Sequence, residues 1–214
     1  MKETTRLILI RHGETAWNSQ GQYQGHSDVG LSEKGKWQAY RLQERFAQEP
    51  ISAFYASDLR RALETAAIIA APHGQAVRPV PALREINFGL WEGLTHREIA
   101  ATHPEALKQW LLGAGEVTVP GGESFAQVRE RAWQAVQAII AEHRGQKVLA
   151  VSHGGTIRSL LCAVLNLDTA SVWRLAQDNA AVNIVDFYPE LPVVVLLNDT
   201  SHLYPSHKAA SIKL

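Results

Sequence analysis

Two histidines, His12 and His153, each follow a short apolar run and each precede a glycine. The apolar runs, residues 7–10 and 148–151, are typical of strands buried on both faces of a parallel sheet. Residues just past the carboxyl ends of parallel strands line the ligand crevice of an α/β sheet, and glycine lets the backbone turn sharply there. We therefore expect both imidazole rings to share one pocket, separated by no more than about 8 Å.

Arg11 places a cation directly beside His12. A guanidinium presents paired N–H donors that match phosphate oxygens. A neutral imidazole nitrogen is a good nucleophile near neutral pH, because the unperturbed pKa of histidine is about 6.5. Either histidine alone is more often a strand-end residue that bonds to the backbone. The pair beside an arginine instead indicates in-line attack on a phosphoryl group.

The composition restricts the classes of partner. The chain has 21 Lys+Arg and 21 Asp+Glu, so the excess of cations that favours nucleic-acid binding is absent from the sequence. The single Cys162 lies in the apolar run 160–165, where a buried hydrophobic role is expected rather than a disulfide or a metal cage. The N-terminal apolar run is too short for a signal peptide or a membrane span. We expect a cytoplasmic protein with no nucleic-acid or membrane partner.

Strands and helices alternate along the chain. Beyond the two runs above, strands are predicted at residues 53–56, 182–188 and 193–197, and helices at residues 33–48, 59–71 and 124–144. The last helix begins with a capping box, Ser124 with Gln127. This alternation predicts an α/β fold with three α/β/α layers and a mainly parallel central sheet.

We expect one domain over residues 1–214. The stretch of about residues 90–123 is the least regular and is expected to form a lid or a subdomain over a site. The tail after Tyr204 is expected to fray.

Two segments resemble the histidine phosphatase superfamily, also called phosphoglycerate-mutase-like. They are Leu9-Ile10-Arg11-His12-Gly13-Glu14-Thr15 and Ser152-His153-Gly154-Gly155. Further motifs follow in the family's order: Trp17-Asn18, Gln24-Gly25, Asp28, Leu31-Ser32 with Gly35, Ser57-Asp58-Leu59-Arg60-Arg61-Ala62 with Thr65-Ala66, Leu83-Arg84-Glu85, Gly89-Leu90-Trp91-Glu92-Gly93 and Pro120-Gly121-Gly122-Glu123-Ser124. A lone Arg-His-Gly would be weak evidence, but these ordered motifs together are specific and span nearly the whole chain.

The resemblance implies a phosphomonoester hydrolase and assigns a role to each matching residue. His12 matches the nucleophile that becomes phosphohistidine, and Glu85 matches the proton donor to the leaving group. The residues that match phosphate-binding positions are Arg11, Arg61, His153, Asn18 and Gln24, with Gly25 and Gly154 beside them. The residues alone do not distinguish Arg61 from Arg60, or Glu85 from Glu92 and Glu98; only the family motif selects them.

These roles are physically coherent. Arg11, Arg61 and a charged His153 would supply three positive charges to a dianionic monoester, so neither a metal nor another cofactor is expected. Glu85 must carry a proton before the first step and accept one from water in the second. The negative charge of the substrate favours the protonated carboxyl.

The segment after Glu85 matches phosphatases rather than cofactor-dependent phosphoglycerate mutases, which are the alternative. No second anion site is expected beyond the pocket of Arg11 and Arg61. Gln22 stands where many phosphatases carry Arg, which argues against strongly anionic substrates. Broad-specificity and α-ribazole phosphatases are the most similar in pattern, and the sequence does not separate them.

Two other classes are less favoured: a non-catalytic phosphoryl-binding module, and a metal hydrolase, for which clustered ligands are lacking. Whether His26, Trp91 and Trp110 line the pocket, and whether the chain is a homodimer, is left open.

Overall fold

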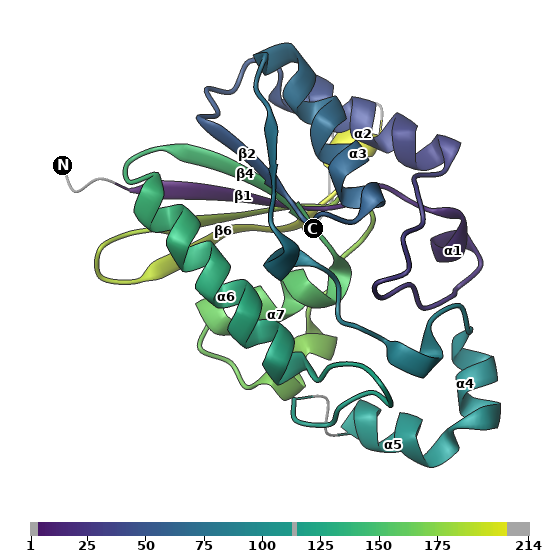
Figure 1. The fold of residues 1–214 in the computed structure, drawn as a ribbon. Coiled ribbons are helices and arrows are strands. Elements are labelled where there is room, and N and C mark those ends of the chain that lie inside the picture. The colour runs from purple at the N-terminus through teal and green to yellow at the C-terminus, as the bar shows by residue number, and fades with distance from the viewer. Residues whose placement is uncertain (1–3, 113–114, 205–214) are drawn as a thin grey trace, which may run out of the picture.

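A six-stranded sheet forms the centre of the molecule (Figure 1), shown by a computed structural model that describes residues 4–112 and 115–204. The strand order is β3-β2-β4-β1-β5-β6. The strands are β1 (Thr5–Arg11), β2 (Ala53–Ala56), β3 (Val77–Pro79), β4 (Lys147–Ser152), β5 (Val182–Phe187) and β6 (Pro192–Asp199). The first four are parallel, while β5 and β6 are antiparallel to their neighbours, which confirms the mainly parallel sheet. The short edge strand β3 is absent from the sequence-based prediction because its outer residues are exposed and lack an apolar pattern.

Helices cover both faces of this sheet, as Figure 1 shows. On one face lie α2 (Glu33–Phe46) and α3 (Arg60–Ala70), and on the other lie α6 (Phe125–Glu142) and α7 (Gly154–Val164). Successive side chains of β1 point to opposite faces, so Leu9 joins the core under α6 and α7, while Ile8 and Ile10 join the core under α2 and α3. The three-layer prediction is therefore confirmed.

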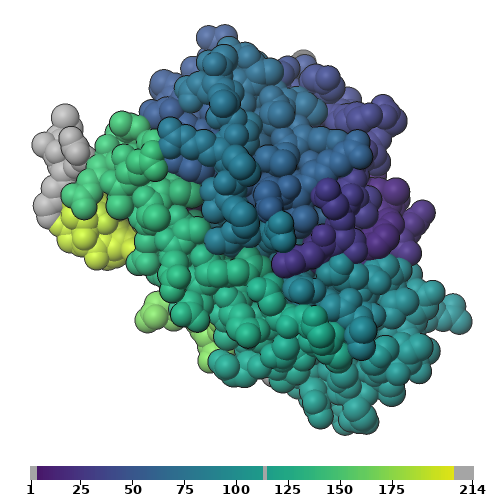
Figure 2. Space-filling view, viewed as in Figure 1, coloured from purple at the N-terminus to yellow at the C-terminus, as the bar shows by residue number. Residues whose placement is uncertain are grey.

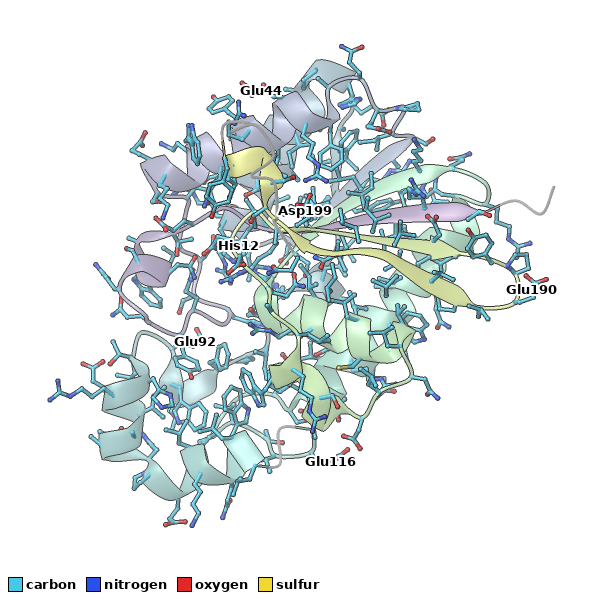
Figure 3. The ribbon with its side chains drawn as sticks, turned by 180° about the vertical axis from the view of Figure 1, so that it is seen from behind. His12, Glu44, Glu92, Glu116, Glu190 and Asp199 are labelled. Carbon is cyan, nitrogen blue, oxygen red and sulfur yellow. The ribbon has the colours of Figure 1, made fainter. Side chains whose placement is uncertain are left out.

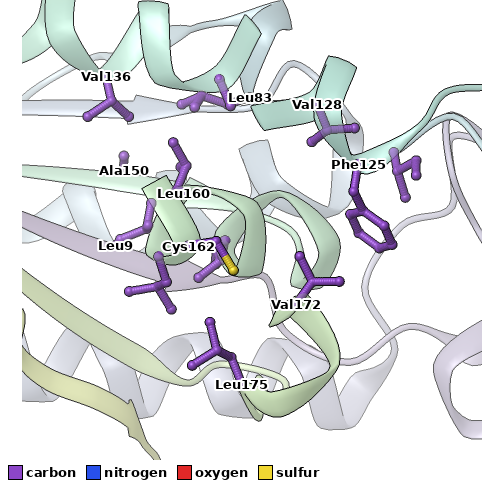
Figure 4. Packing of buried hydrophobic residues seen from close by; sticks show 14 of the residues in the cluster. Leu9, Leu83, Phe125, Val128, Val136, Ala150, Leu160, Cys162, Val172 and Leu175 are labelled. Carbon is purple, nitrogen blue, oxygen red and sulfur yellow. The ribbon is translucent and has the colours of Figure 1, made fainter. Parts of the chain in front are cut away.

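The core on the α6–α7 side is shown in Figure 4, where Leu9, Leu160 and Val172 surround Cys162. Cys162 is fully buried, as predicted from its apolar surroundings. The sequence pattern does not predict α7 as a helix. Eight of its eleven residues are buried, and it begins with two glycines, which are poor helix formers.

The stretch around residues 90–123 is more regular than expected. It contains α4 (His96–Thr102) and α5 (Pro104–Leu112), which corrects the prediction of an irregular segment. Both helices are short, and the chain is not helical at His103 between them. Pro104 follows His103, and a proline disfavours helical geometry in the residue before it. This segment lies against the chain around α1 (Ala16–Ser19): the Tyr23 N–H donates to the carbonyl of Leu94, and Figure 2 shows the purple and teal surfaces in contact.

Short 3₁₀ turns complete the fold at Ala71–His73, Pro81–Leu83, Gly89–Trp91, Thr169–Arg174 and Ser201–Leu203. The predicted fraying after Tyr204 concerns residues outside the described ranges. Within those ranges, none of the helices has the length and apolar character that crossing a membrane requires.

Candidate active site

His12 and His153 follow directly after the paired strands β1 and β4. The strand register pairs Arg11 with Ser152, and the His12 N–H donates to the Ser152 carbonyl at 3.0 Å. The two ring centroids are 5.1 Å apart, which confirms that the rings lie within the predicted distance of each other. Figure 3 places His12 beyond the ends of these strands. His12 lines a pocket of about 260 Å³, and the His153 ring packs against His12 without being among the lining residues.

The His12 ring has a defined orientation. Its Nδ1 lies 2.7 Å from the Gly13 carbonyl oxygen, which can only accept, so Nδ1 carries the proton. Nε2 is therefore left with its lone pair. Burial, followed by the positive charges of Arg61 and Arg11, holds the pKa of His12 well below its ordinary value. The ring is thus neutral, with an available lone pair on Nε2.

His153 has the opposite tautomer. Arg61 Nε donates to His153 Nδ1 at 3.2 Å, so the proton of the neutral ring lies on Nε2. That nitrogen is buried and has no hydrogen-bond partner within the described residues. Burial and the charge of Arg61 hold the pKa of His153 well below its ordinary value. The expectation of a charged His153 is therefore wrong: this residue offers a neutral N–H donor, and the arginines supply the charge.

Arg61 is fully buried, although Arg60 beside it pairs with Glu64 at the surface. Its terminal nitrogens donate to the carbonyls of Ser27 at 2.8 Å and Gly25 at 2.7 Å. The structure thus separates two arginines that the sequence pattern alone leaves equivalent.

Arg11 approaches the pocket from β1. Its terminal nitrogen donates to the Gln177 carbonyl at 2.6 Å, and its buried Nε has no partner among the residues described. Burial lowers the pKa of Arg11 and of Arg61 to about 10, so both guanidinium groups are charged at neutral pH. Two fixed cations therefore converge beside the two imidazoles.

Glu92 fixes the loop whose carbonyl groups, those of Gly25 and Ser27, bind Arg61. Its carboxylate accepts hydrogen bonds from the N–H groups of His26 (2.7 Å) and Ser27 (2.9 Å) and from the Ser27 hydroxyl (2.6 Å). Gly25 has a φ of +52°, and a Cβ there would lie 2.0 Å from a Glu92 oxygen. Glu92 is therefore a positioning residue, which the sequence marks only as part of a motif.

Glu85 borders the pocket at the N-terminus of α7. Its carboxylate accepts from the N–H groups of Ile86 (3.0 Å), Gly155 (3.1 Å) and Thr156 (3.1 Å). A Cβ at Gly155 would lie 2.6 Å from Glu85 Oε1, so glycine is needed for this close approach. The sequence pattern alone does not distinguish Glu85 from Glu92 and Glu98. In the structure Glu92 binds the backbone of a loop and Glu98 caps α4.

Arg131, on α6, fixes the backbone that carries Glu85. Its guanidinium donates to the carbonyls of Ala82, Arg84 and Glu85 at 2.7–2.9 Å and is paired with Glu123. Nothing in the sequence pattern singles out Arg131, because its partners lie about 47 residues earlier in the chain.

The amide side chains Asn18 and Gln24 both line the pocket, as predicted. The Asn18 oxygen accepts from the Thr15 N–H and from Asn179, and the Gln24 oxygen accepts from the Thr15 hydroxyl. Since their oxygens are occupied, each amide presents its NH₂ group as a donor. Gly25 and Gly154 also line the pocket.

The sequence leaves open whether His26, Trp91 and Trp110 line the pocket, and the structure answers this for each of them. His26 donates to the Glu85 carbonyl at 3.0 Å and is not among the pocket-lining residues. Trp91 and Trp110 are both fully buried in the core, and of the two only Trp110 also lines the pocket.

The pocket also contains residues that the sequence did not indicate, above all Arg158 and Trp173. Arg158 adds a third cation to the pocket that Arg11 and Arg61 line. Within residues 4–112 and 115–204, no group of three or more His, Cys, Asp or Glu side chains is arranged to hold a metal ion.

Comparisons with known proteins agree with this geometry. The family model described as "Histidine phosphatase superfamily (branch 1)" matches residues 7–200. Phosphoserine phosphatase 1 of Hydrogenobacter thermophilus is 35% identical over 208 residues, which cover 95% of this chain and 99% of the relative. The metal-independent phosphoserine phosphatase of Arabidopsis thaliana is 37% identical over 205 residues, which cover 94% of this chain and 84% of the relative.

A solved structure extends the likeness to three dimensions. It is a phosphoserine phosphatase mutant from Entamoeba histolytica in complex with phosphoserine, with a TM-score of 0.86 and 30% identity over 94% of this chain and 100% of that one. The resemblance seen in the ordered motifs is thereby confirmed. The chain is a phosphatase and belongs to the histidine phosphatase superfamily, branch 1.

Proposed function

We propose that this phosphatase transfers the phosphoryl group of a small monoester to Nε2 of His12 and then to water, and that phosphoserine-type esters are its substrates. The observation that carries the proposal is the orientation of the two rings. His12 presents a lone pair, and His153, with its ring centroid 5.1 Å away, presents an N–H donor. One phosphoryl group between them can be attacked by the first ring and bound by the second.

In the first step Nε2 of His12 forms a bond to phosphorus while the bond from phosphorus to the ester oxygen breaks. Arg11 and Arg61 neutralise the phosphoryl oxygens, and the amide NH₂ groups of Asn18 and Gln24 donate to them. Glu85 gives its proton to the departing oxygen, so the alcohol leaves neutral.

In the second step water attacks the phosphorus of phosphohistidine. Glu85, now a carboxylate, accepts a proton from that water as the bond to His12 breaks. Inorganic phosphate is released, His12 is neutral again and Glu85 is protonated. The backbone donors that hold Glu85 keep the same carboxyl group in place for both transfers.

The substrate class follows from size and from the relatives. A pocket of about 260 Å³ is smaller than the typical drug-sized ligand site of roughly 300 to 1,000 Å³, which favours a small metabolite. Relatives named phosphoserine phosphatase favour phosphoserine among such metabolites. Turnover without a metal is part of the proposal, supported by the name of the Arabidopsis relative and by the two arginines. A single domain and a cytoplasmic location are proposed on the sequence alone, which leaves open whether the chain forms a homodimer.

The test is to trap the intermediate. We expect enzyme mixed with radiolabelled phosphoserine and quenched in alkali to retain an acid-labile label on His12. His12→Ala should lose this label and at least about a thousandfold in turnover, since the nucleophile is removed. His96→Ala is the matched control, because His96 is exposed and absent from the pocket lining. A His12→Ala variant that keeps a tenth of the wild-type rate would contradict the proposal.

Product analysis separates hydrolysis from mutase activity. With phosphoglycerate as substrate and bisphosphoglycerate as primer, we expect free phosphate to be released faster than phosphoglycerate is isomerised. Isomerisation that outpaces phosphate release would assign the chain to the mutase alternative instead.

A further inference from the structure

Arg158 is the one pocket cation that the steps above do not use. It lies on α7, one turn after Gly154, and it lines the pocket. Its Nε donates to the Leu175 carbonyl at 2.8 Å, which fixes the side chain. Its two terminal nitrogens have neither a hydrogen bond nor an ion pair to any residue that the structure describes. They are also not sealed in the core, so they are available to a ligand.

The position of Arg158 assigns it to the leaving-group side. Arg61 contacts His153 directly, whereas Arg158 lies one helical turn beyond the Gly155 N–H that holds Glu85. Burial lowers the pKa of Arg158, and the negative charge of Glu85 opposes that shift. Of the three pocket arginines, Arg158 is the one whose guanidinium lies over an aromatic ring, that of Trp173, so it faces the apolar part of the pocket, where the group attached to the departing oxygen would lie.

Aromatic side chains complete this end of the pocket. The Arg158 guanidinium lies 5.8 Å from the Trp173 ring centroid. Trp173 packs edge-on against Trp110 at 4.8 Å and Phe125 at 5.4 Å, and all three rings line the pocket. The wall therefore offers apolar surface with a single cation at its edge. One guanidinium with two free terminal nitrogens matches one planar carboxylate.

We propose that Arg158 binds a carboxylate of the leaving group through its two terminal nitrogens. The substrates it selects are phosphomonoesters of small hydroxy acids or amino acids in which the carboxylate lies a few bonds from the ester oxygen. This inference rests on the proposed function, since it places the ester oxygen at Glu85. It also answers the doubt raised by Gln22, because α7 supplies the cation that the mouth of the pocket lacks.

The test compares two monoesters that differ by one carboxylate, L-phosphoserine and O-phosphoethanolamine. We expect wild-type kcat/KM to favour phosphoserine, and Arg158→Gln to lower the ratio of the two values by about tenfold to a hundredfold. Arg158→Lys should lower the ratio less, because the charge remains while the paired donors are lost. Arg129→Gln is the matched control: Arg129 also donates to a backbone carbonyl, that of Leu167, but lies outside this pocket, so the ratio should not change.

Each outcome is decisive. An unchanged ratio in Arg158→Gln, or a wild-type ratio near one, would overturn the inference. An equal loss on both esters would show that Arg158 acts on the chemistry at Glu85 and would also overturn it. Residual hydrolysis of 4-nitrophenyl phosphate shows that each variant is folded.

The proposed function fails separately, if wild-type enzyme releases phosphate from none of the three esters. Calorimetry then still decides the inference, because His12→Ala protein should bind phosphoserine more tightly than phosphoethanolamine, and the added Arg158→Gln change should remove that preference.

Discussion

The two ends of the pocket are built in different ways. At the phosphate end, charged and polar side chains are held by directional bonds: Arg61 by two carbonyls and His153, and Glu85 by three backbone N–H groups. At the leaving-group end, Trp110 and Trp173 meet through ring contacts, which are less directional. Fixed donors suit one transition state, whereas an aromatic wall with one cation suits a class of leaving groups.

The largest effect should come from the phosphate end. Arg61→Gln should lower kcat/KM about a hundredfold on every monoester, because a buried charge-assisted donor to the phosphoryl oxygens is lost. Steady-state rates with phosphoserine, phosphoethanolamine and 4-nitrophenyl phosphate measure it. Arg60→Gln is the control from the same helix, since Arg60 pairs with Glu64 at the surface. A loss confined to one ester would contradict the view that the phosphate end acts on every monoester while the other end selects the leaving group.

The phosphate end was also the part most readable from the sequence. Apolar runs that end in Arg11-His12-Gly13 and Ser152-His153-Gly154 predict adjacent strands, and the structure pairs β1 with β4 in that register. Only the family motif identifies Arg61 as a site residue. A residue off the apolar face of a helix can point either into solvent or into a pocket, and the helical pattern does not distinguish the two. The tautomers of His12 and His153 could not be predicted, since they depend on a carbonyl and a guanidinium placed by the fold.

Most residues of the leaving-group end could not be predicted from the sequence. Arg158 lies on a helix whose residues are mostly buried, and a single cation on it gives no sign in the sequence that it lies in a pocket. Trp110, Phe125 and Trp173 come from three separate segments and meet only through tertiary packing. Glu92 and Arg131 escape sequence analysis for a related reason, since each binds backbone groups that are distant along the chain.

A smaller effect concerns stability in acid. His153 has a lowered pKa in the folded protein, so folding favours its neutral form; this stabilisation is present above the unfolded-state pKa of about 6.5 and is lost as the pH falls. Between pH 7.5 and pH 5.5 the free energy of unfolding should decrease by about 1.4 kcal/mol more in wild type than in His153→Gln. Urea denaturation at the two pH values measures this, with His96→Gln as an exposed control. Identical pH dependence in wild type and His153→Gln would show that His153 is not held neutral by burial.

The smallest effect should come from the aromatic wall. Trp173→Leu removes a ring that is 40% exposed and lies beside the Arg158 guanidinium. A cation–π contact at such a site contributes roughly 0.5 to 1 kcal/mol, so KM for phosphoserine should rise about two- to fivefold while kcat stays close to wild type.

Steady-state kinetics checks this against Trp37→Leu, which removes a similarly exposed ring from α2, outside this pocket. The reason for a small effect is that Trp173 lies beside Arg158, the cation proposed to bind the leaving group, rather than beside the groups proposed to bind the phosphoryl oxygens. A hundredfold loss of kcat in Trp173→Leu would place the ring in the transfer chemistry, and the distinction between a catalytic end and a selective end of the pocket would then be wrong.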